Sequence, residues 1–426
     1  MAHIKIASLG VISTIAVLSA SALPANAAGF YIQESSISSL GSAFSGSTTS
    51  IDDASTIFFN PAGMTDLSGA QISAGANVLI PNADIKDTGG STLPPGITAT
   101  TGSGNPYDPA VVPNFFAATP VNGDQLWLGL GVSAPFGLVS EYDQDWFGRY
   151  DSTETELTTI NASFVSAYKV NDMLSIGGGV DVQYADADLK SAIYFGGGPA
   201  LEGVSRLEGD DISFGYNIGA TLKPAEGTEL GVHYRSAISH ELDGTISATG
   251  TAADFNIDGT ADLDLPDIAT FGVSQDINDK LTLMGQATWF GWNNFQDITA
   301  RDNSGAQISS VVQNYQTTWA FAIGAEYDYS DKWTFRAGYQ HDETPTTDTY
   351  RTSRTPDGDR NWFTTGATYT LNDKISLDMA AAYIDISDET INVTRNDGAS
   401  PLLASNVSAT TGGDVGIISF GVNYKF

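Results

Sequence analysis

The chain of 426 residues is strongly acidic, with 50 Asp and Glu against 18 Lys and Arg and a formal net charge of −32. Charged residues make up only 16% of it, whereas soluble domains carry about 25%. The scarcity of basic side chains argues against a nucleic-acid partner, and the absence of cysteine excludes disulfides and thiolate metal sites. Hydrophobic residues at 41%, without a Gly-x-y period, exclude collagen-like and fully disordered chains.

Residues 1–27 are predicted to be a secretory signal peptide. His3 and Lys5 precede an apolar run over residues 6–18, and small residues follow up to an expected cleavage after Ala27. A membrane anchor is the alternative, but the run is shorter than the roughly 20 apolar residues of a spanning helix. No later segment approaches such a span, so a mature chain in a membrane would have to cross it as a closed barrel.

The rest of the chain alternates between apolar and polar residues with a period of two. Near the carboxyl end, Ile418, Phe420, Val422 and Tyr424 share one face of a strand, and Ser, Gly and Asn occupy the other. Soluble β-sandwiches also alternate. Segments near ten residues, aromatic residues toward the ends of the apolar face and Gly on the opposite face favour the membrane. The predicted fold class is all-β, a transmembrane antiparallel β-barrel of about fourteen strands.

The expected strand cores are separated by short turns at one end and long loops at the other. They cover residues 71–80, 114–121, 125–137, 157–170, 173–189, 211–222, 228–241, 263–277, 280–292, 317–329, 332–341, 361–371, 374–386 and 415–426. Short Asn- and Asp-containing turns are expected at 170–172, 276–279, 329–331 and 371–374. Longer loops are expected at 84–113, 190–209 and 342–360. This asymmetry is typical of outer-membrane barrels.

Several of these loops are acidic, which fits plain solvation or cation-bridged packing against lipopolysaccharide. A calcium site is the alternative, but no complete EF-hand loop is present.

Residues 28–70 are predicted to form a hatch, or plug, inside the barrel of residues 71–426. A barrel of this strand number is wide enough to need a filling. The hatch is rich in Ser, Gly and Thr, and we expect Phe30, Phe44, Asn60, Pro61 and Ala62 to anchor it. A disordered periplasmic tail is the alternative, but such a tail has no reason to hold three apolar residues directly before the Asn-Pro-Ala turn.

These residues carry a family resemblance. The run at 39–46, Asp52-Asp53 and the Asn60-Pro61-Ala62 motif resemble the FadL family of outer-membrane long-chain fatty acid and hydrocarbon transporters, and weaker similarity continues to the terminal Phe426. The resemblance implies a monomeric fourteen-stranded barrel with an amino-terminal hatch in the bacterial outer membrane, among lipid and lipopolysaccharide. It also implies passive uptake of hydrophobic small molecules, without ATP.

A break in the third strand is the candidate exit for such molecules. Ala134, Pro135, Phe136 and Gly137 interrupt it, because proline removes a ladder hydrogen bond and glycine weakens the strand around it. We interpret the four residues as a kink that opens the wall sideways, a feature that the resemblance also implies. A simple β-bulge near the strand end is the alternative.

Arg235, Arg336 and Arg360 match positions where the family also has arginine, so they are candidates for hatch bracing or for binding a ligand head group. We favour the bracing role, in which these arginines pair with carboxylates on the inward face of the barrel and hold the hatch. Where family members place basic side chains for a fatty carboxylate, this chain has Asp186 and Thr299, with Arg301 close by on the same face as Thr299. This departure from the family pattern counts against a fatty acid, because a neutral alkane or aromatic hydrocarbon needs no counter-charge. The sequence does not decide between the two ligands.

Other classes of function have less support in the sequence. Histidine residues do not occur at metal-ligand spacing and no G-x-S-x-G motif is present, so we predict neither an enzyme nor a bound metal or cofactor. An outer-membrane esterase with a dispersed triad and a surface adhesin remain minor alternatives. A general polar-solute porin is the stronger rival.

Overall fold

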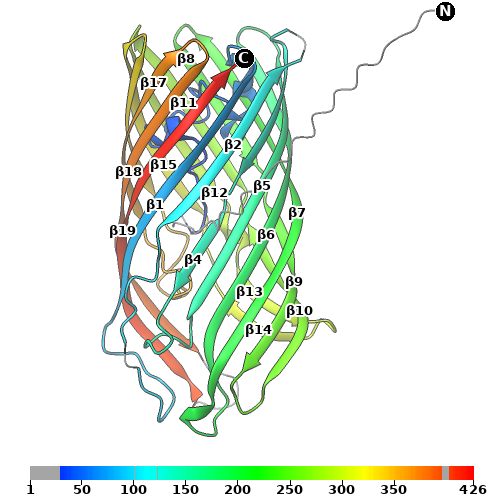
Figure 1. The fold of residues 1–426 in the computed structure, drawn as a ribbon, viewed down its shortest axis with the longest axis vertical. Helices are drawn as coiled ribbons and strands as arrows, with labels where there is room; N and C mark the ends of the chain where they lie inside the picture. Colours follow the sequence, from blue (N-terminus) through cyan, green and yellow to red (C-terminus); the bar gives the residue numbers. More distant parts are fainter. Residues whose placement is uncertain (1–28, 100, 122, 396–402) are drawn as a thin grey trace, which may run out of the picture.

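The computed structural model describes residues 29–99, 101–121, 123–395 and 403–426. The predicted signal peptide therefore lies outside the described residues. Nineteen strand segments form one closed antiparallel sheet, in which β1 pairs with both β2 and β19 (Figure 1). Consecutive segments such as β3 and β4, or β8 and β9, are pieces of one broken strand, so the described chain forms a closed barrel of 14 strands. The predicted fold class is confirmed.

The segments in chain order are α1(Ile37–Leu40), α2(Thr56–Phe59), η1(Pro61–Asp66), β1(Gln71–Asp87), β2(Ala110–Pro120), β3(Leu126–Ser133), β4(Gly137–Glu141), β5(Glu154–Lys169), β6(Leu174–Tyr194), η2(Pro199–Leu201), β7(Glu202–Ala225), β8(Thr228–Arg235), β9(Ile238–Thr249), β10(Phe255–Leu265), β11(Ile268–Asn278), β12(Leu281–Phe290), η3(Trp292–Asn294), β13(Asp297–Asp302), β14(Gln307–Val312), β15(Thr318–Ser330), β16(Trp333–Asp342), β17(Arg360–Asn372), β18(Ile375–Arg395) and β19(Ser405–Lys425). None of the helices in the described ranges is long and apolar enough to cross a bilayer.

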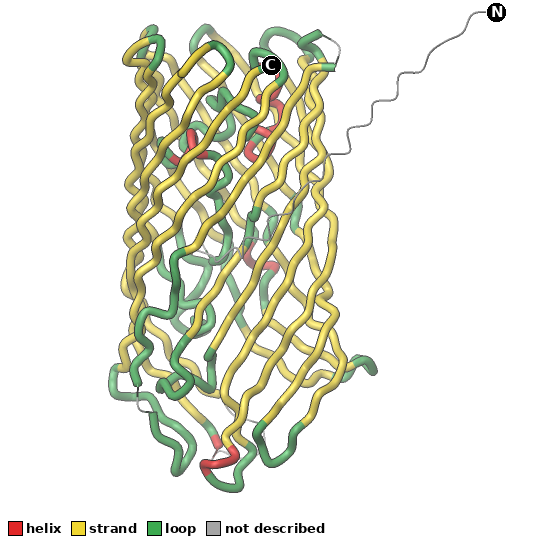
Figure 2. The backbone as a smooth tube through the Cα atoms, in the orientation of Figure 1, coloured by secondary structure: helices red, strands yellow, loops and turns green. Residues whose placement is uncertain are grey.

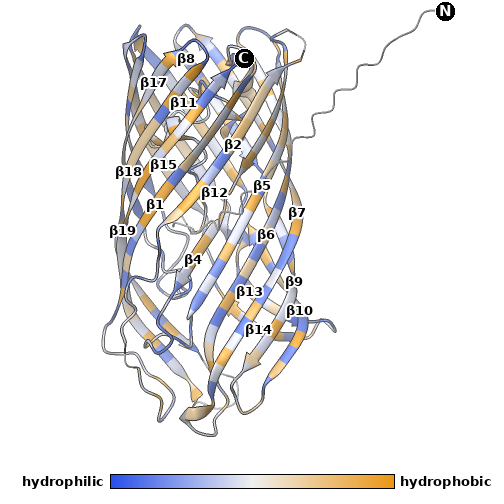
Figure 3. Ribbon diagram, viewed as in Figure 1, coloured by the Kyte–Doolittle hydropathy of each residue, from blue (hydrophilic) through white to orange (hydrophobic). Residues whose placement is uncertain are grey.

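Apolar side chains cover the outside of the wall because alternate residues of each strand point outward. Phe214 and Ile323, for example, are 72% and 65% exposed, whereas Ala185 and Asn217 on inward faces are fully buried. Figure 3 shows hydrophobic and hydrophilic residues taking turns along the strands. An outward apolar surface of this extent is stable only against lipid.

The four predicted short turns are confirmed, since β5, β11, β15 and β17 are each followed closely by the next strand at the end where the chain terminates (Figure 1). We call this the short-turn end and the opposite end the long-loop end. The predicted loop at 342–360 is also confirmed.

The predicted loop at 190–209 is wrong. Most of it extends β6 and β7 into a tall hairpin in which Leu189 pairs with Leu207 and Lys190 with Arg206. Within the hairpin, leucines that face inward alternate with charged residues that face outward. The alternation therefore persists in the part of each strand that lies beyond the apolar band. The expected loop at 84–113 is too long at both ends, because β1 continues to Asp87 and β2 starts at Ala110.

We expect an Ile323→Arg substitution to destabilise the barrel by about 2–4 kcal/mol, the cost of arginine on a lipid-facing strand near the bilayer midplane. Ile323 lies near the middle of β15 and is largely exposed. The measurement is denaturant unfolding in phospholipid vesicles, with Ile323→Leu as the control. An unchanged unfolding midpoint would show that this face does not contact lipid.

Candidate functional site

The segment that precedes β1 fills the interior of the barrel at the short-turn end. Its three helical turns α1, α2 and η1 lie inside the wall (Figure 2), and the predicted anchors Phe30, Phe44, Asn60, Pro61 and Ala62 are all buried. Phe30 packs edge-on against Trp292 with ring centroids 4.7 Å apart. The hatch inside the lumen is therefore confirmed, while its exact division from the barrel at residue 70 stays a prediction.

The Asn-Pro-Ala turn is tied to the wall by its asparagine. The Asn60 Oδ1 caps η1 by accepting from Ala62 N at 3.2 Å, and Nδ2 donates to Thr48 O at 2.9 Å and to Ala220 O of β7 at 3.1 Å. Gly219 lies so close to this side chain that a Cβ there would overlap Asn60 Oδ1. Glycine on the wall thus permits the close approach on which these hydrogen bonds depend.

Arg235 contacts both the wall and the same part of the hatch. Its guanidinium forms a buried ion pair with Asp181 at 3.0 Å, donates to Phe58 O at 3.0 Å and lies 4.6 Å from the centroid of the Phe58 ring. Asp181 also accepts from Ser163 and Asn217, so its charge is fully partnered. A cation held this way by the wall and by the plug stabilises their contact.

The remaining predicted arginines occupy three different environments. Arg336 pairs with Glu326 at 2.6 Å beside the hatch, and Arg360 is bound by Asp357 and donates to Gly29 O at 3.4 Å, which fastens the start of the hatch. Arg301 pairs in register with Thr260, while the adjacent pair of Ala300 and Ala261 faces the interior. Arg301 therefore points away from the lumen.

The predicted kink coincides with a break between β3 and β4. The ladder between β2 and β3 stops at the pair of Phe115 and Val132, whereas β5 continues to pair with β4. The hatch takes the vacated position: Ile32 N donates to Pro135 O at 2.7 Å, and Gly137 N donates to Phe30 O at 2.9 Å. Backbone hydrogen bonds thus join the hatch directly to the interrupted strand.

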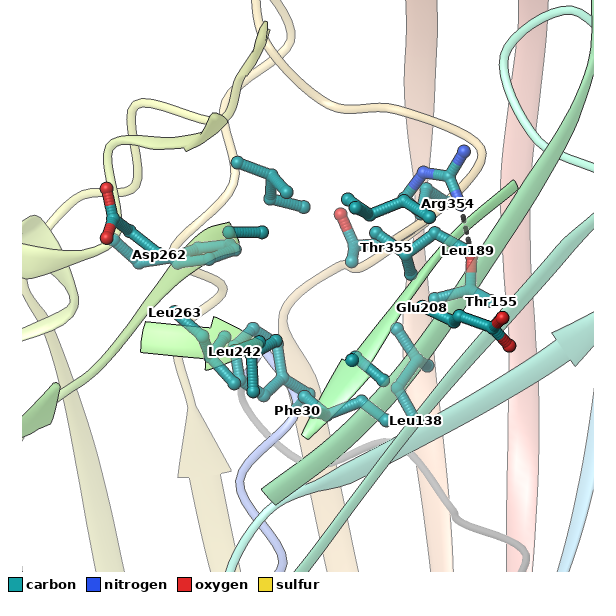
Figure 4. Close-up of a pocket in the computed structure, with 17 residues that line it drawn as sticks. Phe30, Leu138, Thr155, Leu189, Glu208, Leu242, Asp262, Leu263, Arg354 and Thr355 are labelled. Atoms are coloured by element: carbon teal, nitrogen blue, oxygen red, sulfur yellow. Dashed lines mark hydrogen bonds between the residues drawn. The ribbon is translucent and has the colours of Figure 1, made fainter. Parts of the chain in front are cut away.

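A cavity lined mainly by apolar side chains lies between Phe30 and the long-loop end. Leucines from several strands line it, together with Phe295 and Ile298 and with Arg354 and Thr355 from the loop after β16 (Figure 4). The lining leucines are Leu138, Leu157, Leu189, Leu207, Leu242 and Leu263.

The loop of residues 343–359 borders this cavity on the long-loop side through Arg354 and Thr355. Residues 351–355 in the middle of the loop are buried, and Ser353 donates from N and Oγ to Asp151 Oδ2 at 2.7 and 2.6 Å. The loop also reaches the start of the hatch, because Gly29 N donates to Asp357 Oδ2 at 3.0 Å. We call residues 343–359 the roof loop. Sequence reasoning selected only its neighbour Arg360 and missed Arg354 and Asp357, although all three arginines of the run R-T-S-R-T-P-D-G-D-R turn out to be buried.

Two recesses at the short-turn end differ from the cavity in their polarity. Both have Asp52 in their lining, and the larger, of about 1290 Å³, also has Asp66, Glu229 and Glu326 against a single Lys223. Among the described residues, no group of three or more His, Cys, Asp or Glu side chains is placed to hold a metal ion. The recesses at this end of the lumen are therefore polar, and the larger one is rich in carboxylates.

The model of the family described as "Outer membrane protein transport protein (OMPP1/FadL/TodX)" matches residues 17–426. The chain belongs to this family. A long-chain fatty acid transport protein of Escherichia coli O6:H1 is 29% identical over 410 residues, which cover 87% of this chain and 90% of that protein. Outer membrane protein P1 of Haemophilus influenzae is 29% identical over 447 residues, covering 94% and 96%.

Solved structures agree with this membership. A Pseudomonas aeruginosa FadL homologue superposes with a TM-score of 0.83 at 27% identity and covers 94% of this chain and 100% of its own. The toluene transporter TodX of Pseudomonas putida shares the fold with a TM-score of 0.66 at 17% identity, covering 88% and 94%. This FadL-family chain is thus an outer-membrane β-barrel of a family of transport proteins.

Gly219→Ala is expected to dislodge the Asn-Pro-Ala turn, because its Cβ would overlap Asn60 Oδ1 and overpacking costs about 1–3 kcal/mol. A displaced turn loosens the plug, so we expect more frequent current openings in planar bilayers and a lower melting temperature. Gly416→Ala is the matched control, since no atom lies within 4 Å of a Cβ added there. Identical currents for both variants would show that this contact does not hold the hatch.

Proposed function

We propose that this protein takes up hydrophobic small molecules across the outer membrane by passive diffusion, as a monomer and without ATP. The observation that carries the proposal is an apolar cavity bounded by the hatch residue Phe30, with the adjoining hatch backbone bonded to the break in the wall. The names of the relatives attribute long-chain fatty acid transport or toluene transport to those proteins. Both are apolar cargoes that an open water-filled pore serves poorly.

Binding energy is readily available in such a cavity. Each methylene transferred from water contributes about 0.8 kcal/mol, so an alkyl chain of about ten carbons gains several kcal/mol. Release is the harder step, since the same energy holds the ligand in place. Movement of the hatch supplies a route, because Phe30 lines the cavity and the backbone of Phe30 and Ile32 is hydrogen-bonded to the β3–β4 break.

A sideways exit follows from the contrast between the two candidate routes. Toward the short-turn end the ligand would meet Asp52, Glu229 and Glu326 in a polar recess. Through the break at Ala134–Gly137, the ligand passes into the apolar layer around the barrel. When the hatch withdraws Ile32 and Phe30, the edge of the interrupted strand is freed and the opening in the wall becomes continuous with the cavity.

A general polar-solute porin remains the rival function. A porin requires a continuous aqueous path, whereas the buried hatch occupies the lumen across the Asn60 and Arg235 contacts. Steady ion conductance therefore separates the two functions: a plugged transporter carries little current and a porin carries a large one.

Pro135→Ala combined with Gly137→Ala is expected to lower hydrocarbon or fatty acid uptake several-fold while the barrel still assembles. The double substitution restores a backbone donor and stiffens the break, so β2 and β3 can pair farther and narrow the opening. Uptake of a radiolabelled ligand by cells with equal surface levels is the measurement, with Pro120→Ala at the end of β2 as the control. Unchanged uptake in the double variant would remove the sideways exit.

Deletion of residues 28–53 should raise single-channel conductance strongly, because the segment fills the lumen. The widened path would be lined by Glu229, Asp276 and Glu326, so the open pore should prefer cations over anions. Reversal potentials in a KCl gradient measure the preference. A silent pore after the deletion would argue that the segment is not the plug, and a large conductance before it would favour the porin.

A further inference from the structure

Arg354 is the polar end of an otherwise apolar cavity. It is 6% exposed, and its two Nη atoms donate to Glu154 O and Thr155 Oγ1, both at 3.1 Å, and to Asp151 O at 2.9 Å. All these acceptors are neutral. No hydrogen bond from Nε and no carboxylate ion pair of Arg354 is formed within the described part of the chain.

The carboxylate nearest to Arg354 is already used by a second arginine. Arg395 donates from Nε to Asp151 Oδ1 at 2.8 Å, and Ser353 occupies Oδ2. Burial raises the pKa of Asp151, but the charge of Arg395 and the Ser353 hydrogen bonds outweigh it and hold this pKa below its ordinary value. The buried guanidinium of Arg354 and the half-buried guanidinium of Arg395 thus share one ionised carboxylate, which leaves a net positive charge at this end of the cavity.

The other charged groups of the lining do not neutralise this charge. Glu208 is bound by Arg206 at 2.5 Å, on the outward face of β7, and Asp262 is exposed on β10. Figure 4 shows both carboxylates turned away from the centre of the cavity, while Arg354 lies beside it with its hydrogen bond to Thr155. Burial lowers the pKa of Arg354 to about 10, with Asp151 opposing the shift, so the guanidinium stays charged at neutral pH.

We propose that Arg354 of the roof loop recognises the anionic head of the ligand, and that this chain prefers an apolar molecule ending in one carboxylate over a neutral hydrocarbon. The inference rests on the proposed function. The leucine walls take the tail, and the free Nε donor together with the net positive charge takes the carboxylate. The positions where the family resemblance placed head-group residues do not compete: Asp186 lies on the face of β6 opposite to Ala187, which lines the cavity.

The physical reason is the cost of a buried charge. A neutral ligand that fills the cavity would displace water from Arg354 without replacing the lost hydration, which penalises binding. A carboxylate compensates the charge with a charge-assisted hydrogen bond, and such bonds are stronger than neutral ones. The same apolar tail therefore binds more tightly with a carboxylate head than with a hydroxyl head.

The test compares dodecanoate with 1-dodecanol at pH 8 on the purified full-length barrel, by displacement of an apolar fluorescent probe in one nonionic detergent. Wild type should bind dodecanoate about 10-fold more tightly or better, the scale of a charge-assisted hydrogen bond. Arg354→Gln should lose this preference while its affinity for 1-dodecanol stays the same or rises. Arg354→Lys, which keeps the charge, should retain part of it.

Arg351→Gln is the matched control, because Arg351 is buried in the same roof loop but pairs with Glu389 at 3.3 Å and does not line the cavity. It should keep the preference for dodecanoate. Equal affinities of wild type for the two probes, or an Arg354→Gln variant that keeps the preference, would overturn the inference and leave the proposed function standing. Binding of neither probe would count against both. If Arg354→Gln fails to assemble, the affinities of wild type and of Arg354→Lys for dodecanoate and 1-dodecanol still test the inference.

Discussion

A wall that faces lipid must pair its backbone polar groups within the protein, and the hatch of this barrel takes part in that pairing. Where Pro135 stops the ladder between β2 and β3, Ile32 N and Phe30 O supply hydrogen bonds to the interrupted strand. The plug is thus also a partner of the wall at the place where the wall lacks its own. Any displacement of residues 30–32 leaves Pro135 O and Gly137 N without their partners, so the state of the hatch and the state of the break are coupled energetically.

The period-two alternation made the barrel predictable, because a lipid-facing strand carries an apolar residue at every second position. Its limits are equally physical. In the hairpin of β6 and β7 beyond the apolar band, the outward positions carry Asp188, Lys190, Arg206 and Glu208. Cross-strand ion pairs form there between Arg206 and Asp188 and between Lys190 and Glu154 of β5. Charge on the outer face resembled a loop in the sequence, although Leu189 and Leu207 kept the inward alternation. Strand ends outside the bilayer are therefore under-predicted by hydrophobicity.

The candidate site was predictable only where a local motif carries it. The Asn60-Pro61-Ala62 motif was selected through its family resemblance and the apolar residues before it, and in the structure Asn60 caps the turn that follows. Arg235 was selected because it matches an arginine position of the family, whereas its pairing with Asp181 could be found only once β6 and β8 were placed. Arg354 gave no local signal at all. Its significance comes from the roof loop crossing to Asp151 and Thr155, more than 190 residues away in sequence, which no pattern within the loop encodes.

The charge distribution along the lumen favours one exit route for the ligand over the other. The long-loop end offers a net positive charge at Arg354 next to an apolar cavity, whereas the recesses at the short-turn end are rich in carboxylates around Asp52. A carboxylate-bearing molecule is therefore attracted at the cavity and repelled from the axial route behind the hatch. Under the proposed function, the ligand leaves through the break at Ala134–Gly137. On this route its apolar tail avoids water, and its carboxylate head avoids the carboxylates of the recess. Electrostatics and hydrophobicity then favour the same sideways path, although each acts on a different part of the ligand.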